Sequence, residues 1–104
     1  MVVAFDFDGC LSEYKVQVLA KKMVRSGGIE VWVVTKRRSG EHNKDLFLVL
    51  DKVGISKSQV IYTNDKSKKE FLEGINADLF IDNDVMDFYE INNETNTLAV
   101  HFTK

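Results

Sequence analysis

The sequence has no proline, a single cysteine and no long apolar run. With Cys10 as the one thiol, an internal disulfide is excluded, which fits a reducing compartment. No stretch approaches the roughly 20 apolar residues that span a bilayer. The first residues enter an apolar strand pattern without the basic region of a signal peptide. We therefore expect a cytoplasmic protein that does not enter a membrane.

The net charge is also small, at −2 for 104 residues. This excludes a strong overall attraction to nucleic acid or to an anionic membrane surface. Hydrophobic residues make up 44% and charged residues 29% of the chain, as in ordinary globular proteins. The length suits one domain over residues 1–104 with a single core, and no repeat, linker or low-complexity tract divides it.

Short apolar runs alternate with helix-like segments, a pattern typical of βα units and a parallel sheet. The first strand begins at Val2, and further strands are expected at 29–35, 58–63, 78–82 and 97–102. Helices are expected from a Ser12 cap to Arg25 and at 41–53, 68–75 and 85–91. The pattern predicts an α/β fold, namely a three-layer, Rossmann-like α/β/α domain with a five-stranded, mainly parallel sheet. Its short connections leave no room for a cap domain.

Two carboxylates, Asp6 and Asp8, follow the first apolar run. Because parallel α/β sheets place their chemistry at the carboxyl ends of the strands, both lie where a site is expected. Two close carboxylates repel each other, most strongly where water is partly excluded. A bound cation is the simplest way to hold them together, although an isolated Asp-x-Asp is also common as a polar strand exit.

Other strand ends carry polar groups to the same edge of the predicted sheet. Thr35 ends the second strand, and Asp82-Asn83-Asp84 ends and follows the fourth. A cluster of three lysines precedes or begins the helix before the fourth strand: Lys66, Lys68 and Lys69. This combination is far more specific than any one of its parts.

Four segments together resemble the motifs of the haloacid dehalogenase (HAD) superfamily. Phe5 to Leu11, read as Phe-Asp-Phe-Asp-Gly-Cys-Leu, is similar to the first motif, commonly Asp-x-Asp-Gly-Thr-Leu. Val31 to Thr35 looks like the second motif, an apolar strand that ends in Thr or Ser. Lys68 to Leu72 resembles the third, lysine-bearing motif, and Leu79 to Asp84 the acidic fourth. The four occur in family order and cover nearly the whole chain.

The resemblance implies a minimal, capless phosphatase that hydrolyses phosphoric monoesters with Mg²⁺. Asp6 would be the nucleophile and form an aspartyl-phosphate, while Asp8 serves as general acid and base. The Mg²⁺ ion would be held by Asp6, by the backbone carbonyl of Asp8 and by one residue of the fourth motif. Asn83 is the expected ligand there, with Asp82 orienting the lysine; in a shifted register Asp82 is the ligand instead.

The resemblance also implies which groups bind the phosphate. These are the N–H groups near Phe7 and Asp8, the Thr35 hydroxyl, the Lys36 N–H and one lysine of the third motif. Lys68 fits that motif best, Lys66 on the loop is the second choice, and Lys69 stays open.

The chain departs from the family pattern at Cys10, where threonine is usual. We interpret this thiol as a small buried side chain rather than a nucleophile. Asp84 and Asp87 are interpreted as charges at a helix N-terminus, with a second layer around the metal as the alternative. His42 and His101 lack the spacing of metal ligands.

Without a cap, the expected site is open. Relatives of this kind act on macromolecular phosphates, or form homo-oligomers in which a neighbouring copy covers a small phosphorylated substrate. The basic run Lys36-Arg37-Arg38 favours a nucleotide or a nucleic-acid end. Two alternatives stay open: a fold of this type that binds Mg²⁺ or phosphate without turnover, and a receiver-like signalling domain. A receiver needs a phosphorylatable aspartate at the exit of the third strand, where this chain has Tyr62-Thr63-Asn64-Asp65.

Overall fold

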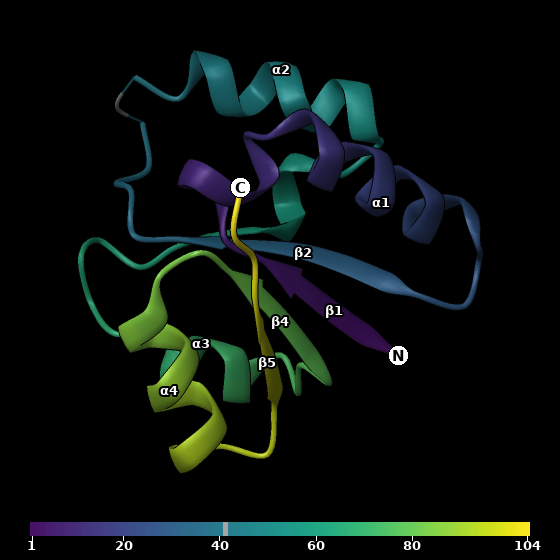
Figure 1. The fold of residues 1–104 in the computed structure, drawn as a ribbon. Helices are drawn as coiled ribbons and strands as arrows, with labels where there is room; N and C mark the ends of the chain where they lie inside the picture. Colours follow the sequence, from purple (N-terminus) through teal and green to yellow (C-terminus); the bar gives the residue numbers. More distant parts are fainter. Residues whose placement is uncertain (41) are drawn as a thin grey trace.

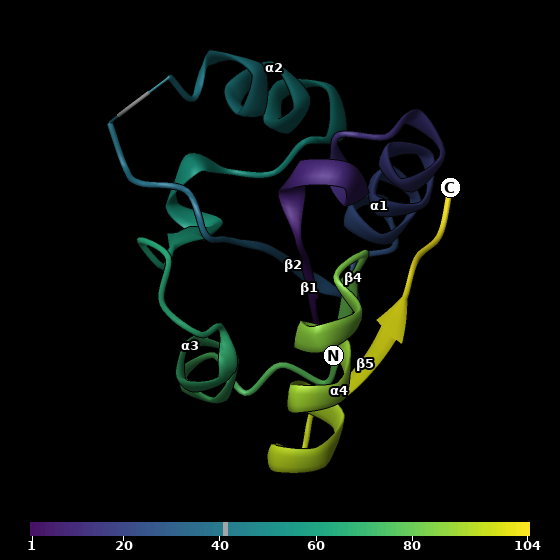
Figure 2. The ribbon, with the colours of Figure 1, turned by 60° about the vertical axis from the view of Figure 1, so that its left-hand side comes forward.

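A five-stranded parallel sheet forms the centre of the computed structural model, which describes residues 1–40 and 42–104 (Figure 1). Its strands are β1 (Val2–Phe5), β2 (Glu30–Thr35), β3 (Val60–Tyr62), β4 (Leu79–Asp82) and β5 (Leu98–His101). Helices α1 (Tyr14–Arg25) and α2 (Lys44–Val53) cover one face, and α3 (Lys69–Gly74) and α4 (Val85–Glu94) cover the other. The turned view shows the same three layers (Figure 2). The predicted α/β class is confirmed, and the described residues include no cap domain.

The strand order is β3-β2-β1-β4-β5, and each neighbouring pair is parallel. The chain moves outward from β1 to β3 and then crosses back to place β4 on the other side of β1. In parallel α/β sheets, this reversal opens a crevice at the carboxyl ends of the two strands. Asp6 directly follows β1 and Asp82 ends β4, so the topology brings both carboxylates to that crevice.

Strand β1 is buried on both faces, which explains its unbroken apolar sequence. Val3 and Phe5 belong to the core beneath α1 and α2, whereas Ala4 belongs to the core beneath α3 and α4. All three side chains are fully buried. Because such a strand has no face open to water, its first carboxylate comes only at Asp6, where the chain leaves the sheet.

The first helix begins later than predicted. Ser12 was expected to cap it, but its hydroxyl oxygen accepts the Gly9 N–H at 2.9 Å and closes the helical turn Phe7–Leu11 after β1. Helix α1 begins at Tyr14, with Glu13 at its N-cap position. The expectation for Ser12 was wrong because this side chain shapes the turn that carries the two aspartates.

Two further boundaries differ because of local and tertiary contacts. Asn92 was expected in a turn, but its amide bonds both backbone groups of Ala99 on β5, at 2.9 and 2.8 Å, and α4 continues to Glu94. The third strand is shorter than predicted, because residues Lys57–Gln59 form a 3₁₀ turn and β3 begins only at Val60.

The helix ends agree better with the predictions. Gly54, at a φ of 92°, ends α2, and Asn76, at a φ of 51°, provides the expected left-handed residue after α3. The predicted start of the second helix, Glu41, lies outside the described residues, and α2 begins at Lys44. Among the described residues, none of the helices has the length and apolar character needed to cross a membrane.

Helix α2 offers a direct test of the core. Leu50 is 1% exposed, whereas Leu48 on the same helix is 61% exposed. Leu50→Ala should lower the free energy of unfolding by about 2–5 kcal/mol, because it leaves a cavity beneath the helix. Leu48→Ala should change it by less than about 0.5 kcal/mol. Urea denaturation followed by circular dichroism measures both variants, and equal losses would contradict this packing.

Candidate functional site

A charged hollow of about 310 Å³ lies at the carboxyl ends of β1 and β4. The residues that line it come from the ends of three strands and from the starts of α3 and α4: Asp6, Asp8, Lys36, Lys68, Asp82, Asn83, Asp84 and Asp87. The predicted first, third and fourth motifs therefore meet at one place.

The Lys68 ammonium is the buried centre of this hollow. Its Nζ donates to Asp6 Oδ1 at 2.6 Å and to Asp82 Oδ2 at 3.1 Å, and it lies 3.6 Å from Asp87 Oδ2. Lys68 is only 2% exposed. Burial lowers the pKa of Lys68, but the Asp6 and Asp82 carboxylates more than offset this, so its pKa is raised and the amine stays charged.

The Asp6 carboxyl group, which contacts the same lysine, has a raised pKa. Burial raises its pKa to about 7, and the Lys68 ammonium opposes this rise only in part, while Asp82 adds to it. Any further positive charge that enters the hollow would stabilise the ionised form of Asp6. The site is thus electrostatically suited to a cation or to a cationic environment around Asp6.

Asp82 has both of its oxygens engaged within the protein. Oδ2 accepts from Lys68, and Oδ1 accepts the backbone N–H of Asp84 at 2.9 Å. Asp82 is fully buried. It therefore orients the lysine and the start of α4, and its side chain has less capacity for an additional ligand than its neighbour Asn83.

The amide end of Asn83 faces two oxygens, Asp6 Oδ2 at 2.8 Å and the Asp8 carbonyl at 3.0 Å. With its nitrogen turned towards them, Asn83 donates to both, an orientation assigned from this hydrogen bonding. With its oxygen turned inward, that oxygen would lie 2.8 Å from Asp6 Oδ2 and 3.0 Å from the Asp8 carbonyl, close to the spacing of about 2.9 Å between adjacent ligands in octahedral Mg²⁺ coordination. Asp6, Asp8 and Asn83 could therefore hold such an ion.

This set of donors is mixed rather than acidic. Among the described residues, no three or more His, Cys, Asp or Glu side chains are grouped so as to hold a metal ion. A metal in the hollow would depend on an amide oxygen and a main-chain carbonyl beside the Asp6 carboxylate. Hard cations such as Mg²⁺ accept such oxygen ligands and commonly keep several waters.

Gly9 makes the close approach of Asn83 possible. It has a φ of +75°, and a Cβ built at this position would lie 2.4 Å from the other terminal atom of the Asn83 amide, the one that does not face Asp6. The turn around it is fixed by hydrogen bonds from the N–H groups of Leu11 and Ser12 to the carbonyls of Asp6 and Phe7. A side chain at position 9 would therefore push Asn83 away from Asp6.

Of the remaining residues predicted to bind phosphate, Lys36 lines the hollow and Thr35 does not. Thr35 is buried, and its Oγ1 accepts the Arg37 N–H at 3.3 Å rather than lining the hollow. Lys36 lines it and reaches Asp87 Oδ1 at 3.4 Å. The Phe7 ring is buried in the core, and the backbone N–H of Phe7 directly follows Asp6.

The three lysines of the cluster are now distinguished by position. Lys68 contacts Asp6, whereas Lys69 pairs with Glu94 at 3.3 Å across α3 and α4. Lys66 is exposed and does not line the hollow. The structure thus brings Lys68 to the predicted nucleophile and leaves Lys66 and Lys69 outside.

Cys10 and Asp84 have the structural roles that the sequence predicts, whereas the Asp87 carboxylate lies inside the hollow. Cys10 is fully buried with its Sγ 3.4 Å from the Ile81 carbonyl, and burial raises the pKa of its thiol, as expected for a structural side chain. Asp84 caps α4 by accepting the N–H groups of Met86 and Asp87, in line with its interpretation as a helix charge. Asp87 is different, because its carboxylate faces Lys36 and Lys68 inside the hollow.

Sequence reasoning missed a second cluster beside the hollow, formed by Arg37, Asp8 and Asp45. Arg37 Nη2 lies 2.7 Å from Asp8 Oδ1, and Arg37 Nη1 lies 2.7 Å from Asp45 Oδ1. The position of Arg37, two residues after Thr35, was a usable signal for its place near the strand ends. Nothing in the sequence points to Asp45, because it comes from the first turn of α2.

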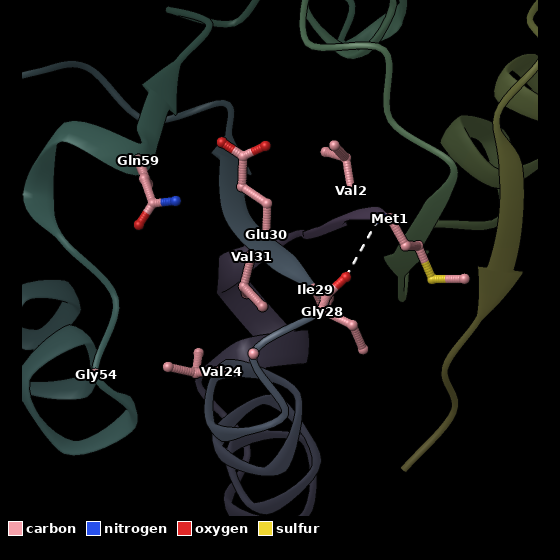
Figure 3. Close-up of a pocket in the computed structure, with 10 residues that line it drawn as sticks. Met1, Val2, Val24, Gly28, Ile29, Glu30, Val31, Gly54 and Gln59 are labelled. Atoms are coloured by element: carbon pink, nitrogen blue, oxygen red, sulfur yellow. Dashed lines mark hydrogen bonds between the residues drawn. The ribbon is translucent and has the colours of Figure 1, made fainter.

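A larger hollow, of about 470 Å³, lies at the amino ends of the strands (Figure 3). Most of the residues that line it are apolar or glycine, and Glu30 and Gln59 are the polar ones. The Met1 amino group donates to the Gly28 carbonyl there at 3.3 Å. This arrangement lacks the converging charges seen around Lys68, so we place the candidate chemistry at the smaller hollow.

No protein-family model matches the chain, and no curated protein matches it significantly. The function must therefore be argued from the arrangement of the residues.

The Arg37–Asp45 pair gives a prediction for titration. Arg37 lowers the pKa of Asp45 to about 2. Since a lowered carboxyl pKa stabilises the fold above the unfolded value, the pair's contribution is present above about pH 4 and fades as the pH falls towards 2. In Arg37→Met, the Asp45 midpoint should rise to about 4. Carboxyl-carbon NMR titration measures it, and Arg38→Met, at an exposed neighbour, should leave it unchanged.

Proposed function

We propose that this protein is a Mg²⁺-dependent phosphomonoester hydrolase that works through an aspartyl-phosphate on Asp6, as its resemblance to the HAD superfamily implies. One observation carries the proposal. Asp6 lies at the switch point of the sheet with Lys68 Nζ 2.6 Å from one carboxylate oxygen and Asn83 beside the other. Positive charge from lysine and from a metal ion stabilises a transferring phosphoryl group, and both could act beside this carboxylate.

In the first step, an Asp6 carboxylate oxygen attacks the phosphorus atom and the bond to the leaving oxygen breaks. Asp8 gives its proton to that oxygen, so the alcohol departs neutral. Asp8 follows Asp6 by two residues on the turn Phe7–Leu11, and its side chain is 62% exposed at the mouth of the hollow. It is therefore accessible to a leaving group that points towards solvent.

In the second step, water attacks the phosphorus atom of the aspartyl-phosphate and Asp8 takes up the water's proton. The bond to the Asp6 oxygen breaks, which releases phosphate and restores the Asp6 carboxylate. Splitting the reaction in this way lets one acid/base residue serve both halves, because its protonation state after each step is the one that the next step needs.

The chain's own cations would bind the phosphate. Lys68 supplies a fixed charge beside Asp6, and Lys36 at the rim supplies a second. The backbone N–H groups of Phe7, Asp8 and Lys36 lie at the same strand ends. We assign Thr35 to shaping the loop after β2, since its hydroxyl oxygen accepts the Arg37 N–H.

The charge balance of the hollow supports a bound divalent cation. Of the five carboxylates that line the hollow, those of Asp6, Asp82 and Asp87 face the two ammonium groups of Lys36 and Lys68. Asp8 pairs with Arg37, and Asp84 caps α4. We assign Asp6, the Asp8 carbonyl and Asn83 as the protein ligands, with Asp82 orienting Lys68. When bound, Mg²⁺ would neutralise phosphate charge and reduce its repulsion with Asp6.

The open hollow favours an accessible phosphate group as the substrate. No cap domain covers it among the described residues, and its lining is polar and charged. A nucleotide, a nucleic-acid end or another exposed phosphomonoester fits this description. For a small phosphorylated molecule, a second copy of the chain would have to complete the site.

The strand order speaks against the receiver alternative. Receiver domains use the order 2-1-3-4-5, in which the third strand adjoins the first. In this protein β3 lies at the edge, beyond β2, so its exit is remote from Asp6. Binding of Mg²⁺ or phosphate without turnover remains the competing proposal, and activity measurements decide between the two.

Replacement of the nucleophile tests the proposed reaction. Wild-type protein should hydrolyse p-nitrophenyl phosphate when Mg²⁺ is present, and Asp6→Asn should lower kcat by at least about 10³-fold, because no covalent intermediate can form. Asp51→Asn, at an exposed carboxylate of α2, should keep full activity. Equal rates for wild type and Asp6→Asn would contradict the role of Asp6, and Mg²⁺ binding without hydrolysis by wild type would favour the alternative.

Two glycine variants test the proposed metal position. Gly9→Ala should displace Asn83 and weaken Mg²⁺ binding by about tenfold or more, since one ligand is lost. Gly27→Ala has nearly the same φ, +78° against +75°, but nothing within 4 Å of its Cβ position, so it controls for backbone strain. The backbone strain should cost each variant about 1–2 kcal/mol of stability, and Gly9→Ala should lose more because it also displaces Asn83. Calorimetric titration with Mg²⁺ measures the affinity, and equal affinities in the two variants would remove Asn83 from the ligand set.

A further inference from the structure

The Arg37 guanidinium has every one of its N–H groups engaged. Nε donates to Asp8 Oδ2 at 3.0 Å, and Nη2 donates to Asp8 Oδ1 at 2.7 Å and to Asp45 Oδ2 at 2.8 Å. Nη1 donates to Asp45 Oδ1 at 2.7 Å and to Asn43 Oδ1 at 3.4 Å. Since a guanidinium carries five N–H groups, none remains for a phosphate unless one of these contacts breaks.

The Phe7 ring and Asn43 also restrict the Arg37 guanidinium and its loop. Its Cζ lies 4.8 Å from the centre of the Phe7 ring, which is buried in the core. Asn43, at the N-cap position of α2, donates to the Arg38 carbonyl at 2.9 Å and so ties the Arg37 loop to this helix. Stacking on an aromatic face and paired carboxylate contacts both restrict an arginine side chain.

We propose that Arg37 is the positioning residue of Asp8, with Asp45 as the anchor that holds Arg37 in place. This inference rests on the proposed phosphatase function. Asp8 is exposed and lies on a turn, so its carboxylate would otherwise sample several rotamers. The paired contact to Nε and Nη2 fixes the plane of the carboxylate, as two parallel N–H bonds do.

The contact leaves room on the Asp8 carboxylate for a proton and for a reacting oxygen. A carboxylate has about four lone-pair positions, and Arg37 occupies one on each oxygen. One position on each oxygen is left for a proton, for the leaving oxygen or for the attacking water. Arg37 thus restricts the direction of the Asp8 carboxylate without blocking its proton transfer.

A dependence on the leaving group follows from this role. A nitrophenolate departs readily without a proton, whereas an alkoxide needs one, so only the second reaction depends strongly on a well-placed acid. Arg37→Met should lower kcat/KM by about 10²-fold for an alkyl phosphate such as glycerol phosphate, and by less than tenfold for p-nitrophenyl phosphate. Asp45→Asn should change both in the same direction by a smaller factor.

A double variant separates positioning from a general structural effect. If Arg37 acts through Asp8, Arg37→Met should cause no further loss in an Asp8→Asn background, because the group that it positions is already gone. Arg25→Met at the exposed end of α1 and Asp51→Asn on α2 provide matched charge changes away from the site and should leave both substrates unaffected.

The experiment measures kcat and KM for both substrates in all of these variants, with thermal unfolding to confirm folded protein. Equal fold-losses for the two substrates, or additive losses in the double variant, would overturn the positioning role while leaving the phosphatase proposal intact. If wild type hydrolyses neither these substrates nor a panel of nucleotides and phosphorylated oligonucleotides, the proposed function fails and the role of Arg37 fails with it.

Discussion

The buried ammonium of Lys68 is the interaction on which the site depends. It connects the end of β1, the end of β4 and the start of α3 through carboxylate contacts at 2.6 and 3.1 Å. Removing an ammonium from water is costly unless carboxylates surround it, so these three elements are held in one arrangement. The burial of Asp6 and the neighbouring Asp82 carboxylate raise the pKa of Asp6 to about 7, so positive charge beside it, from a proton or a cation, is favoured.

The sequence was most informative where burial dictates residue type. Apolar runs predicted the five strands because a parallel sheet is covered on both faces, and a parallel sheet places its strand ends at one edge. The meeting of Asp6, Lys68 and Asp82 could therefore be predicted from the order of these residues along the chain. Among the three lysines, the motif favoured Lys68 but left Lys66 and Lys69 open, because helix position and side-chain direction decide which one reaches Asp6.

Other features depend on side-chain contacts that residue type and hydrophobic pattern do not predict. Asn92 continues a helix where composition predicts a turn, because its amide binds the backbone of Ala99. Asp45 lies against Arg37 only because α2 packs beside the loop after β2. Ser12 has the residue type of a helix cap, but the preceding turn uses its hydroxyl. In each case, a polar side chain satisfies a partner that the neighbouring sequence does not reveal.

The strand order also has a consequence for how the chain is made. β1 is the central strand, and one of its edges pairs with β2. Its other edge pairs with β4, which lies more than 70 residues further along the chain. During synthesis on the ribosome, an apolar strand with an open edge therefore exists before its partner has been added, which is a state prone to aggregation. The step that protects this edge is also the step that first brings Asp82 to Asp6, so successful folding and assembly of the site occur together.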